Sequence, residues 1–289
     1  MLEYGDLVFL WSPKKGDAFL LRLAKGAVQG SRLGQLRHDD FVGKEYGSVV
    51  RSHSGESFAV LRPTLGEYTR RIKRNTQIVY PKEAGFLVMH LNLGPGATVV
   101  ECGTGSGSLT CVFAHFVGPT GRVCTYDRRE DFSELARKNA ERWGVADRIT
   151  FKVRSLDEGF DERDADAVFL DLPNPWDYIA AAEEALAPGN RLAILVPTTN
   201  QIERTLDVLR EHHFADPQVL ELMLRYLKTD PRRIRPEDMM VGHTGYLIFA
   251  SKADPVVLPE EQAAPEAVVL LEAPGEEQKE PTSEEHGEF

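Results

Sequence analysis

One stretch constrains the fold of this chain more than any other. Residues 98–110 read TVVECGTGSGSLT, a short β-branched run followed by an acid, three glycines at alternate positions and a helical pattern. A strand, a glycine turn and a helix start bring backbone N–H groups and a helix N-terminus close to a ligand. Glycine permits positive φ angles and removes side chains that would block that approach. The stretch therefore predicts a ligand-binding turn.

Two acids near the turn narrow the choice of ligand. Glu101 precedes the glycines, and Asp127 follows the next predicted strand, residues 122–126. In doubly wound sheets, a carboxylate at the end of the second strand binds ribose hydroxyls. A glycine motif alone is weak evidence and is also found in ordinary strand-to-helix turns. With both acids present, the pattern favours a nucleoside-type cofactor.

The chain beyond residue 97 alternates between strand and helix patterns. Strands are predicted at 98–102, 122–126, 149–153, 165–171 and 191–196. Helices are predicted near 107–117, 130–143, 176–187 and 200–212. Such alternation predicts an α/β fold with a parallel, doubly wound sheet. Two late strands near 219–224 and 244–250, with no clear helix between them, predict an antiparallel C-terminal hairpin at one edge.

The two ends of the chain differ from this middle part. Residues 1–75 contain four short β patterns, at 6–11, 18–23, 48–51 and 57–61. They predict a small β-barrel-like domain. A linker then leads into a predicted helix over residues 84–91, with Pro81 suited to a first helical position. The larger domain is expected over residues 76–252. Residues 253–289 are rich in Pro, Glu, Ala and Gln, which predicts a disordered acidic tail.

The net charge of −11 is distributed unevenly. Residues 253–289 hold eleven acids and one lysine, whereas residues 1–74 hold 13 basic and 8 acidic residues. A basic N-terminal module is compatible with a polyanionic partner, although a solvated surface fits the charges equally well. Candidate RNA-binding residues lie at the end of this module and in a long predicted loop, residues 225–241: Arg70, Arg71, Arg74, Arg232, Arg233 and Arg235.

Cysteine usage and hydropathy limit the compartment. The three cysteines, Cys102, Cys111 and Cys124, fall in predicted core elements without a C-x-x-C spacing, which argues for a reducing environment and against a metal site. No apolar run approaches the ~20 residues that span a bilayer. The N-terminus lacks the basic segment of a signal peptide. We therefore expect a cytoplasmic protein with no membrane partner.

Further candidate site residues follow the other strands, because ligands of doubly wound sheets bind outside the carboxyl ends of the strands. Arg154, Ser155, Leu156 and Asp157 follow the third strand, where an adenine ring could be held by a side chain or by the backbone. Asp171 follows an apolar run and precedes two prolines, which stiffen the loop. A carboxylate there would face the reactive end of the cofactor. The alternative is an aspartate that caps the next helix or braces the loop.

Five motifs in order carry a family resemblance. ECGTGSG at 101–107 resembles the S-adenosylmethionine motif of class I methyltransferases. The other four motifs are QIVYPK, DLPNPW, PTTNQ and GHTGY, which begin at residues 77, 171, 197 and 242. With them, residues 53–252 resemble the TrmI-type tRNA (adenine-58-N1)-methyltransferase family. The resemblance implies a Rossmann-like methyltransferase sheet behind a small β-domain, S-adenosyl-L-methionine as cofactor, and a homotetramer that methylates N1 of adenine 58 in the T-loop of tRNA.

The same resemblance implies roles for individual residues. Asp171 and Tyr80 match catalytic positions near the target adenine. The implied cofactor-binding residues are Gln77, Glu101, Gly103, Thr104, Gly105, Ser106, Gly107, Ser108, Leu109, Asp127, Arg154, Ser155 and Asp171. The chain departs from the family pattern at Cys102, where alanine is frequent, and at Leu195, where some members carry an aromatic residue. The acidic tail is not part of the shared pattern.

Other functions stay open at this point. The glycine turn alone would also suit a protein-carboxyl or small-molecule methyltransferase. An amino-group N6 methyltransferase would show an Asp/Asn-Pro-Pro-aromatic loop, and an NAD-dependent oxidoreductase would place its third glycine one residue later. A non-catalytic RNA-binding subunit is a further alternative. Retention of both Asp171 and the glycine turn favours an active enzyme.

Overall fold

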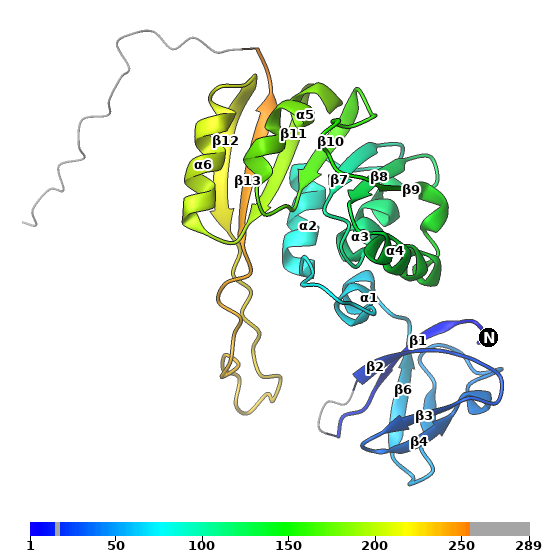
Figure 1. Cartoon of the computed structure of the whole chain (residues 1–289). Helices are drawn as coiled ribbons and strands as arrows, with labels where there is room; N and C mark the ends of the chain where they lie inside the picture. The colour runs from blue at the N-terminus through cyan, green and yellow to red at the C-terminus, as the bar shows by residue number, and fades with distance from the viewer. Residues whose placement is uncertain (15–17, 255–289) are drawn as a thin grey trace, which may run out of the picture. The chain divides into compact units, whose positions relative to one another are not determined.

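The computed structural model describes residues 1–14 and 18–254 (Figure 1). Nearly all of the predicted acidic tail, residues 255–289, lies outside the described residues. Within the described ranges, no helix is long and apolar enough to cross a membrane.

The larger part of the chain is built on a seven-stranded sheet with the order β12-β13-β11-β10-β7-β8-β9 (Figure 1). Its strands are β7 (Thr98–Cys102), β8 (Arg122–Asp127), β9 (Ile149–Val153), β10 (Ala165–Leu170), β11 (Leu186–Val196), β12 (Phe214–Glu221) and β13 (Tyr246–Lys252). Strands β7 to β11 pair in parallel, and β13 is antiparallel to both β11 and β12. The predicted α/β class and the antiparallel edge hairpin are confirmed.

Helices cover both faces of this sheet. They are α1 (Leu65–Arg71), α2 (Pro81–His90), α3 (Ser108–Val117), α4 (Glu130–Trp143), α5 (Ile179–Ala185) and α6 (Thr199–Leu209). Neighbouring residues of a strand point to opposite faces. Val99 therefore packs in one core with residues of α1 to α4, while Val100 packs in the other with residues of α5 and α6. Burial on both faces explains the continuous apolar runs of the central strands.

The chain reverses its direction of travel across the sheet at β7. From β7 it runs outward to β8 and β9, then returns to the other side of β7 to form β10 and β11. The carboxyl ends of β7 and β10 therefore flank a topological switch point, where ligands of open α/β sheets bind.

The N-terminal residues form a smaller β-domain with its own core. A four-stranded antiparallel sheet has the order β2-β1-β6-β5, and β3 pairs with β4 in a separate hairpin. The strands are β1 (Leu7–Trp11), β2 (Ala18–Arg22), β3 (Val28–Ser31), β4 (Gly34–Arg37), β5 (Val49–Arg51) and β6 (Ser57–Leu61). The four predicted strands are confirmed. Strands β3 and β4 were missed because they are short, mostly polar and contain glycine, which weakens any strand pattern.

Helix α1 packs with the larger domain. Tyr68 is 1% exposed and belongs to the same core as Val99. Its hydroxyl donates a hydrogen bond to the Asn139 carbonyl at 2.5 Å, and its ring stacks on Trp143 at 4.7 Å. The last strand of the small β-domain ends at Leu61, and α1, which falls within the expected N-terminal domain of residues 1–75, packs with the core of the larger domain.

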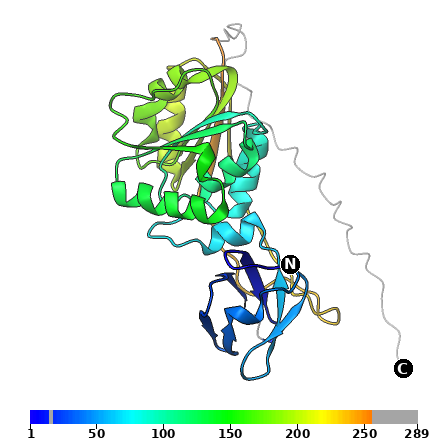
Figure 2. The ribbon, with the colours of Figure 1, turned by 90° about the vertical axis from the view of Figure 1, so that its right-hand side faces the viewer.

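A long segment, residues 222–245, separates β12 from β13, and we call it the arm. It extends beyond the end of the sheet in both views (Figures 1 and 2). Within it, a single isolated bridge joins Leu227 to Pro236. Strand β12 begins at Phe214, earlier than predicted, and contains a register shift between Ala215 and Gln218. Pro217 lacks the N–H of a regular strand residue, which hid this strand start in the sequence.

Candidate active site

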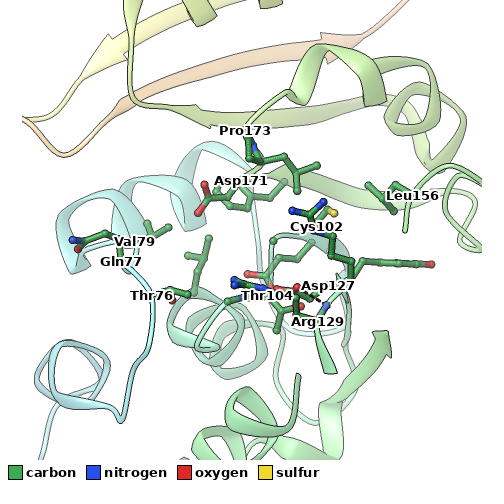
Figure 3. Close-up of a pocket in the computed structure, with 18 of the residues that line it drawn as sticks. Thr76, Gln77, Val79, Cys102, Thr104, Asp127, Arg129, Leu156, Asp171 and Pro173 are labelled. Atoms are coloured by element: carbon green, nitrogen blue, oxygen red, sulfur yellow. Dashed lines mark hydrogen bonds between the residues drawn. The ribbon is translucent and has the colours of Figure 1, made fainter. Parts of the chain in front are cut away.

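A pocket of about 730 Å³ lies at the switch point between β7 and β10. The linker before α2, the glycine turn and the segments that follow β8, β9, β10 and β11 all contribute to its wall. Figure 3 shows Asp127 and Arg129 on one side of the pocket, with Gln77 and Val79 on another. The pocket therefore collects residues that are up to 125 positions apart in the sequence, from Thr76 to Gln201.

The first glycine of the turn is required by the close approach of two strand ends. The backbone N–H of Asp171 donates to the Cys102 carbonyl at 2.8 Å. Gly103 has a φ of +98°, and a Cβ there would lie 2.2 Å from the Asp171 carbonyl oxygen. Any side chain would therefore push the ends of β7 and β10 apart.

The other two glycines have different roles. Gly105 donates its backbone N–H to Oδ2 of Asp127 at 3.0 Å, which joins the turn to the end of β8. Gly107 precedes α3 with a φ of +77°, and a Cβ there would lie 2.7 Å from the Cβ of Ala136 in α4. Gly107 does not line the pocket, and a Cβ there would meet α4. Its part in cofactor binding stays a prediction.

The linker before α2 is tied to the turn through Ser106. Its Oγ accepts from the Asn75 backbone at 3.2 Å and lies 2.9 Å from Oγ1 of Thr76. Nearby, Ser108 lines the pocket, and its hydroxyl is buried and has no hydrogen-bond partner among the described residues. An unpaired buried polar group costs about 1–3 kcal/mol. Ser108 is therefore placed to bind a polar group of a ligand.

Glu101 is buried beneath the turn. Its Oε2 accepts hydrogen bonds from the hydroxyls of Thr110 at 2.6 Å and Thr125 at 2.7 Å. Burial raises the pKa of Glu101 to about 7, against the effect of these hydrogen bonds, and the charge of Asp171 raises it further. A cation bound in the pocket would favour the ionised form of Glu101.

Asp171 presents its carboxyl group to the pocket interior. Figure 3 shows it on the side that faces Val79 and Gln77. The surrounding protein raises the pKa of Asp171 to about 6 by desolvation, although the side chain is exposed to the open pocket. None of its hydrogen bonds within the described part of the chain involves the carboxyl group; its N–H bonds to Cys102. The carboxylate is therefore available to a ligand.

The residues predicted to contact the ribose and the adenine differ in how many of their polar groups are already hydrogen-bonded within the protein. Asp127 accepts from Gly105 and, at 3.0 Å, from the backbone N–H of Arg129, which leaves lone pairs on both oxygens. By contrast, the guanidinium of Arg154 donates to the Gly159 carbonyl and to Asp161, and the Ser155 hydroxyl donates to Asp157 at 2.7 Å. Both line the pocket, but one terminal nitrogen of Arg154 and the hydroxyl proton of Ser155 are used within the protein, whereas Nε of Arg154 is buried without a partner among the described residues.

The structure brings together nearly all the predicted cofactor residues. Every one apart from Gly107 lines the pocket. Tyr80 does not: it is the N-cap residue of α2, and its predicted role near the acceptor stays a prediction. The six predicted RNA-binding arginines are all exposed and lie outside the pocket wall. Among the residues described, no group of acids, histidines or cysteines is arranged to hold a metal ion.

Part of the pocket wall was not expected from the sequence: Ile78, Val79, Cys102, Tyr126, Arg128, Arg129, Phe169 and Tyr178. The remaining residues come from segments that the sequence placed after strands or in the linker: Thr76, Leu156, Leu172, Pro173, Asn174, Pro197 and Gln201. Ile78 and Val79 lie in the linker before α2, and no local pattern marks them as pocket residues.

The fold and pocket define a class of protein. A parallel sheet with one antiparallel strand, a glycine turn after its first strand and a pocket at the switch point are the features of class I methyltransferases. A model of the family described as "tRNA methyltransferase complex GCD14 subunit" matches residues 57–239, and a TrmI-like N-terminal model matches residues 1–50. This chain belongs to that tRNA methyltransferase family.

Two curated relatives are similar over most of the chain. The chain is 33% identical over 264 residues to the tRNA (adenine(57)-N(1)/adenine(58)-N(1))-methyltransferase TrmI of Methanocaldococcus jannaschii, covering 82% of this chain and 92% of the relative. It is 34% identical over 240 residues to the tRNA (adenine(58)-N(1))-methyltransferase TrmI of Thermus thermophilus, covering 83% and 94%.

Two solved structures match the fold closely. The tRNA (m1A58) methyltransferase TrmI of Aquifex aeolicus superposes with a TM-score of 0.78 at 31% identity, covering 88% of this chain and 99% of the other. A Thermotoga maritima protein described as a SAM-dependent O-methyltransferase superposes with a TM-score of 0.85 at 41% identity, covering 89% and 96%. These two descriptions name different acceptor atoms.

Proposed function

We propose that this chain transfers a methyl group from S-adenosyl-L-methionine to N1 of adenine 58 in the T-loop of tRNA. Membership of the family supports the reaction, as do the names of the relatives in Methanocaldococcus jannaschii and Thermus thermophilus. The observation that carries the proposal is the Asp171 carboxyl group, which faces the pocket beside the glycine turn without a hydrogen-bond partner in the described residues.

The pocket residues fit the cofactor. Gly103 and Gly105 both line the pocket, and the buried hydroxyl of Ser108 has no hydrogen-bond partner among the described residues. Asp127 keeps free lone pairs for the hydroxyls of a ribose. Leu156, which is 6% exposed, offers an apolar surface to an adenine ring. When bound, S-adenosylmethionine supplies an electrophilic methyl group on a sulfonium sulfur.

Asp171 has the properties needed to hold the acceptor. N1 of adenine is a neutral nucleophile, so no proton has to leave before it attacks. The carboxylate accepts from the exocyclic N6 amino group, which orients the base, and stabilises the positive charge that grows on the ring. Its pKa of about 6 leaves it ionised at neutral pH, as an acceptor must be. Because N1 lies on the Watson–Crick edge, the base must first leave its stack.

We assign tRNA binding to two exposed basic segments. One lies at and after α1, beside the small β-domain, with Arg70, Arg71 and Arg74. The other is the arm, with Arg232, Arg233 and Arg235. Exposed arginines provide contacts to phosphate oxygens, which position a nucleic acid without reading its sequence.

We also propose that the chain assembles as a homotetramer in the cytoplasm. The arm exposes large apolar side chains, including Met223 at 71%, Ile234 at 67% and Met239 at 90%. Burying such side chains between subunits would stabilise an assembly. A Dictyostelium discoideum relative is named a catalytic subunit, so a heteromeric complex is the contrasting outcome. Size-exclusion chromatography with light scattering on the purified chain should give four times the monomer mass of 32.3 kDa.

The test of the reaction uses labelled S-adenosylmethionine with unmodified tRNA, followed by nucleoside mapping. We expect 1-methyladenosine at position 58, and no transfer to a tRNA in which adenine 58 is replaced by guanine. Label on an oxygen atom of the substrate would instead favour the O-methyltransferase activity named for the Thermotoga maritima protein. Binding of tRNA without any transfer would indicate a non-catalytic subunit.

A further inference from the structure

The base of the arm carries a histidine with a hydrogen-bond partner at each ring nitrogen. Nδ1 of His243 lies 2.7 Å from Oε1 of Glu221, the last residue of β12. Nε2 lies 2.9 Å from the carbonyl oxygen of Pro197, which directly follows β11. The ring also packs against that of Tyr246, with centroids 4.8 Å apart. His243 thus joins the arm to the ends of two strands.

Both partners of His243 are acceptors. A carbonyl oxygen and an ionised carboxylate have no proton to give, so the two hydrogen bonds form together only when both ring nitrogens donate, which is the imidazolium form. The hydrogen bond to Glu221 raises the pKa of His243, and the bond to the Pro197 carbonyl raises it further. The positive charge of Lys82 in α2 lowers this pKa, and Glu83 pairs with Lys82.

The Pro197 side of this link leads into the pocket. Pro197 and Gln201 both line it. The side-chain amide of Gln201 donates to the carbonyl oxygen of Pro173 at 2.9 Å, and Thr198 donates to Oε1 of Gln201 at 2.8 Å. Pro173 lies two residues after Asp171 in the same loop. A path of hydrogen bonds therefore leads from His243 through Pro197, Thr198 and Gln201 to Pro173, in the loop that carries Asp171.

The residues on either side of the arm's base are held separately. The ammonium group of Lys82 donates to the Leu222 carbonyl and to Oγ1 of Thr244, each at 2.6 Å. Thr244 in turn donates to Glu83, which is 2% exposed. The base of the arm is thus anchored to α2. This anchoring holds His243 in place beside the loop that follows β11.

We infer that His243 is a positioning residue, which holds the loop 197–201, and through Gln201 the Asp171 loop, in the arrangement that methyl transfer needs. This inference rests on the proposed function, because that function assigns the binding of the target adenine to Asp171. Deprotonation of His243 leaves one nitrogen with a lone pair opposite an acceptor oxygen, so one of the two links is lost. Turnover should therefore fall as the pH rises through the pKa of His243.

The test compares kcat as a function of pH in three variants of the full chain. His243→Asn should lower kcat about tenfold near neutral pH, remove the alkaline fall, and leave the Kd for S-adenosylmethionine within about twofold. Glu221→Gln should move the alkaline fall to lower pH, since a neutral amide stabilises the imidazolium less. His212→Asn is the matched control: its Nδ1 lies 2.7 Å from Glu183, and neither residue lines the pocket.

A second measurement separates this inference from the proposed function. Amide hydrogen exchange over residues 198–203, measured without tRNA or cofactor, should be faster in His243→Asn than in the wild type and unchanged in His212→Asn. If the wild type does not methylate tRNA but amide exchange over residues 198–203 is faster in His243→Asn, the proposed methyl acceptor in tRNA is wrong and the positioning role of His243 stands. Unchanged exchange, or an alkaline fall that Glu221→Gln does not move, overturns the inference.

Discussion

The pocket and the arm differ in how firmly their residues are held. In the pocket, Gly103 touches the Asp171 backbone and Glu101 is 1% exposed, with two threonine hydroxyls on one oxygen. The two segments of the arm are joined by one isolated bridge, by backbone hydrogen bonds from Lys228 to Arg235 and from Glu237 to Tyr226, and by the ion pair of Asp238 with Lys228. Its apolar side chains are exposed, and Met239 is 90% exposed. A catalytic pocket gains from groups that need no rearrangement during reaction. An exposed arm suits a partner that supplies the missing contacts.

The largest effect is expected when the Asp171 carboxylate, proposed to hold the target adenine, is removed. Asp171→Ala should lower kcat/KM for tRNA by about 100-fold or more, because a charge stabiliser at the reacting ring is lost. Isothermal titration should give a Kd for S-adenosylmethionine within about threefold of the wild type. Asp207→Ala, an exposed aspartate on α6, serves as the control. Unchanged turnover in Asp171→Ala would remove the assigned role.

The rigidity of the turn can be tested with a pair of glycines. Gly103 and Gly144 have similar φ angles, +98° and +86°, but a Cβ on Gly144 meets no atom within 4 Å. Gly144→Ala should therefore cost about 1 kcal/mol of folding free energy from backbone strain alone. Gly103→Ala should cost several times more and abolish cofactor binding. Urea unfolding and titration calorimetry measure both effects, and equal costs would contradict the close strand contact.

Burial of Glu101 should make stability depend on pH. Its pKa is about 7 in the folded chain and near 4.5 when unfolded, so the folded state retains a proton that the unfolded state loses. The retained proton adds to the free energy of unfolding. This stabilisation is complete below about pH 4.5 and is lost as the pH rises through 7. Glu101→Gln should remove it, so that the stability difference between pH 5 and pH 8 shrinks by roughly 2 kcal/mol in urea unfolding. An unchanged difference would mean that Glu101 stays ionised.

The smallest expected effect concerns the arm. The double variant Arg232→Ala, Arg233→Ala should weaken tRNA binding about tenfold at low salt and reduce the salt slope of log K by roughly 2. Binding of S-adenosylmethionine should not change, since neither residue lines the pocket. Arg163→Ala, Arg210→Ala, at two exposed arginines outside the arm, is the matched control. Loss of cofactor binding would show that arm and pocket are not separable.

Local pattern accounts for much of what the sequence predicts here. Strands β7 and β9 and helix α4 begin and end where the periodicity placed them. The glycine turn, Asp127 and Asp171 were found because parallel strands end at the same edge of the sheet, so position along the chain predicts position in space. A bulge hid the start of β12, and short polar strands hid β3 and β4.

The sequence by itself therefore determined the class of fold, the family and the polar groups at the strand ends, because these depend on residue type and on spacing along single elements. Only the tertiary structure decided how the side chains are used. In the structure, Arg154 donates a hydrogen bond to Asp161, Gly107 packs against α4, and Tyr80 lies outside the pocket wall. It also joined His243 to Pro197. These choices depend on contacts between residues distant in sequence, which no local period encodes.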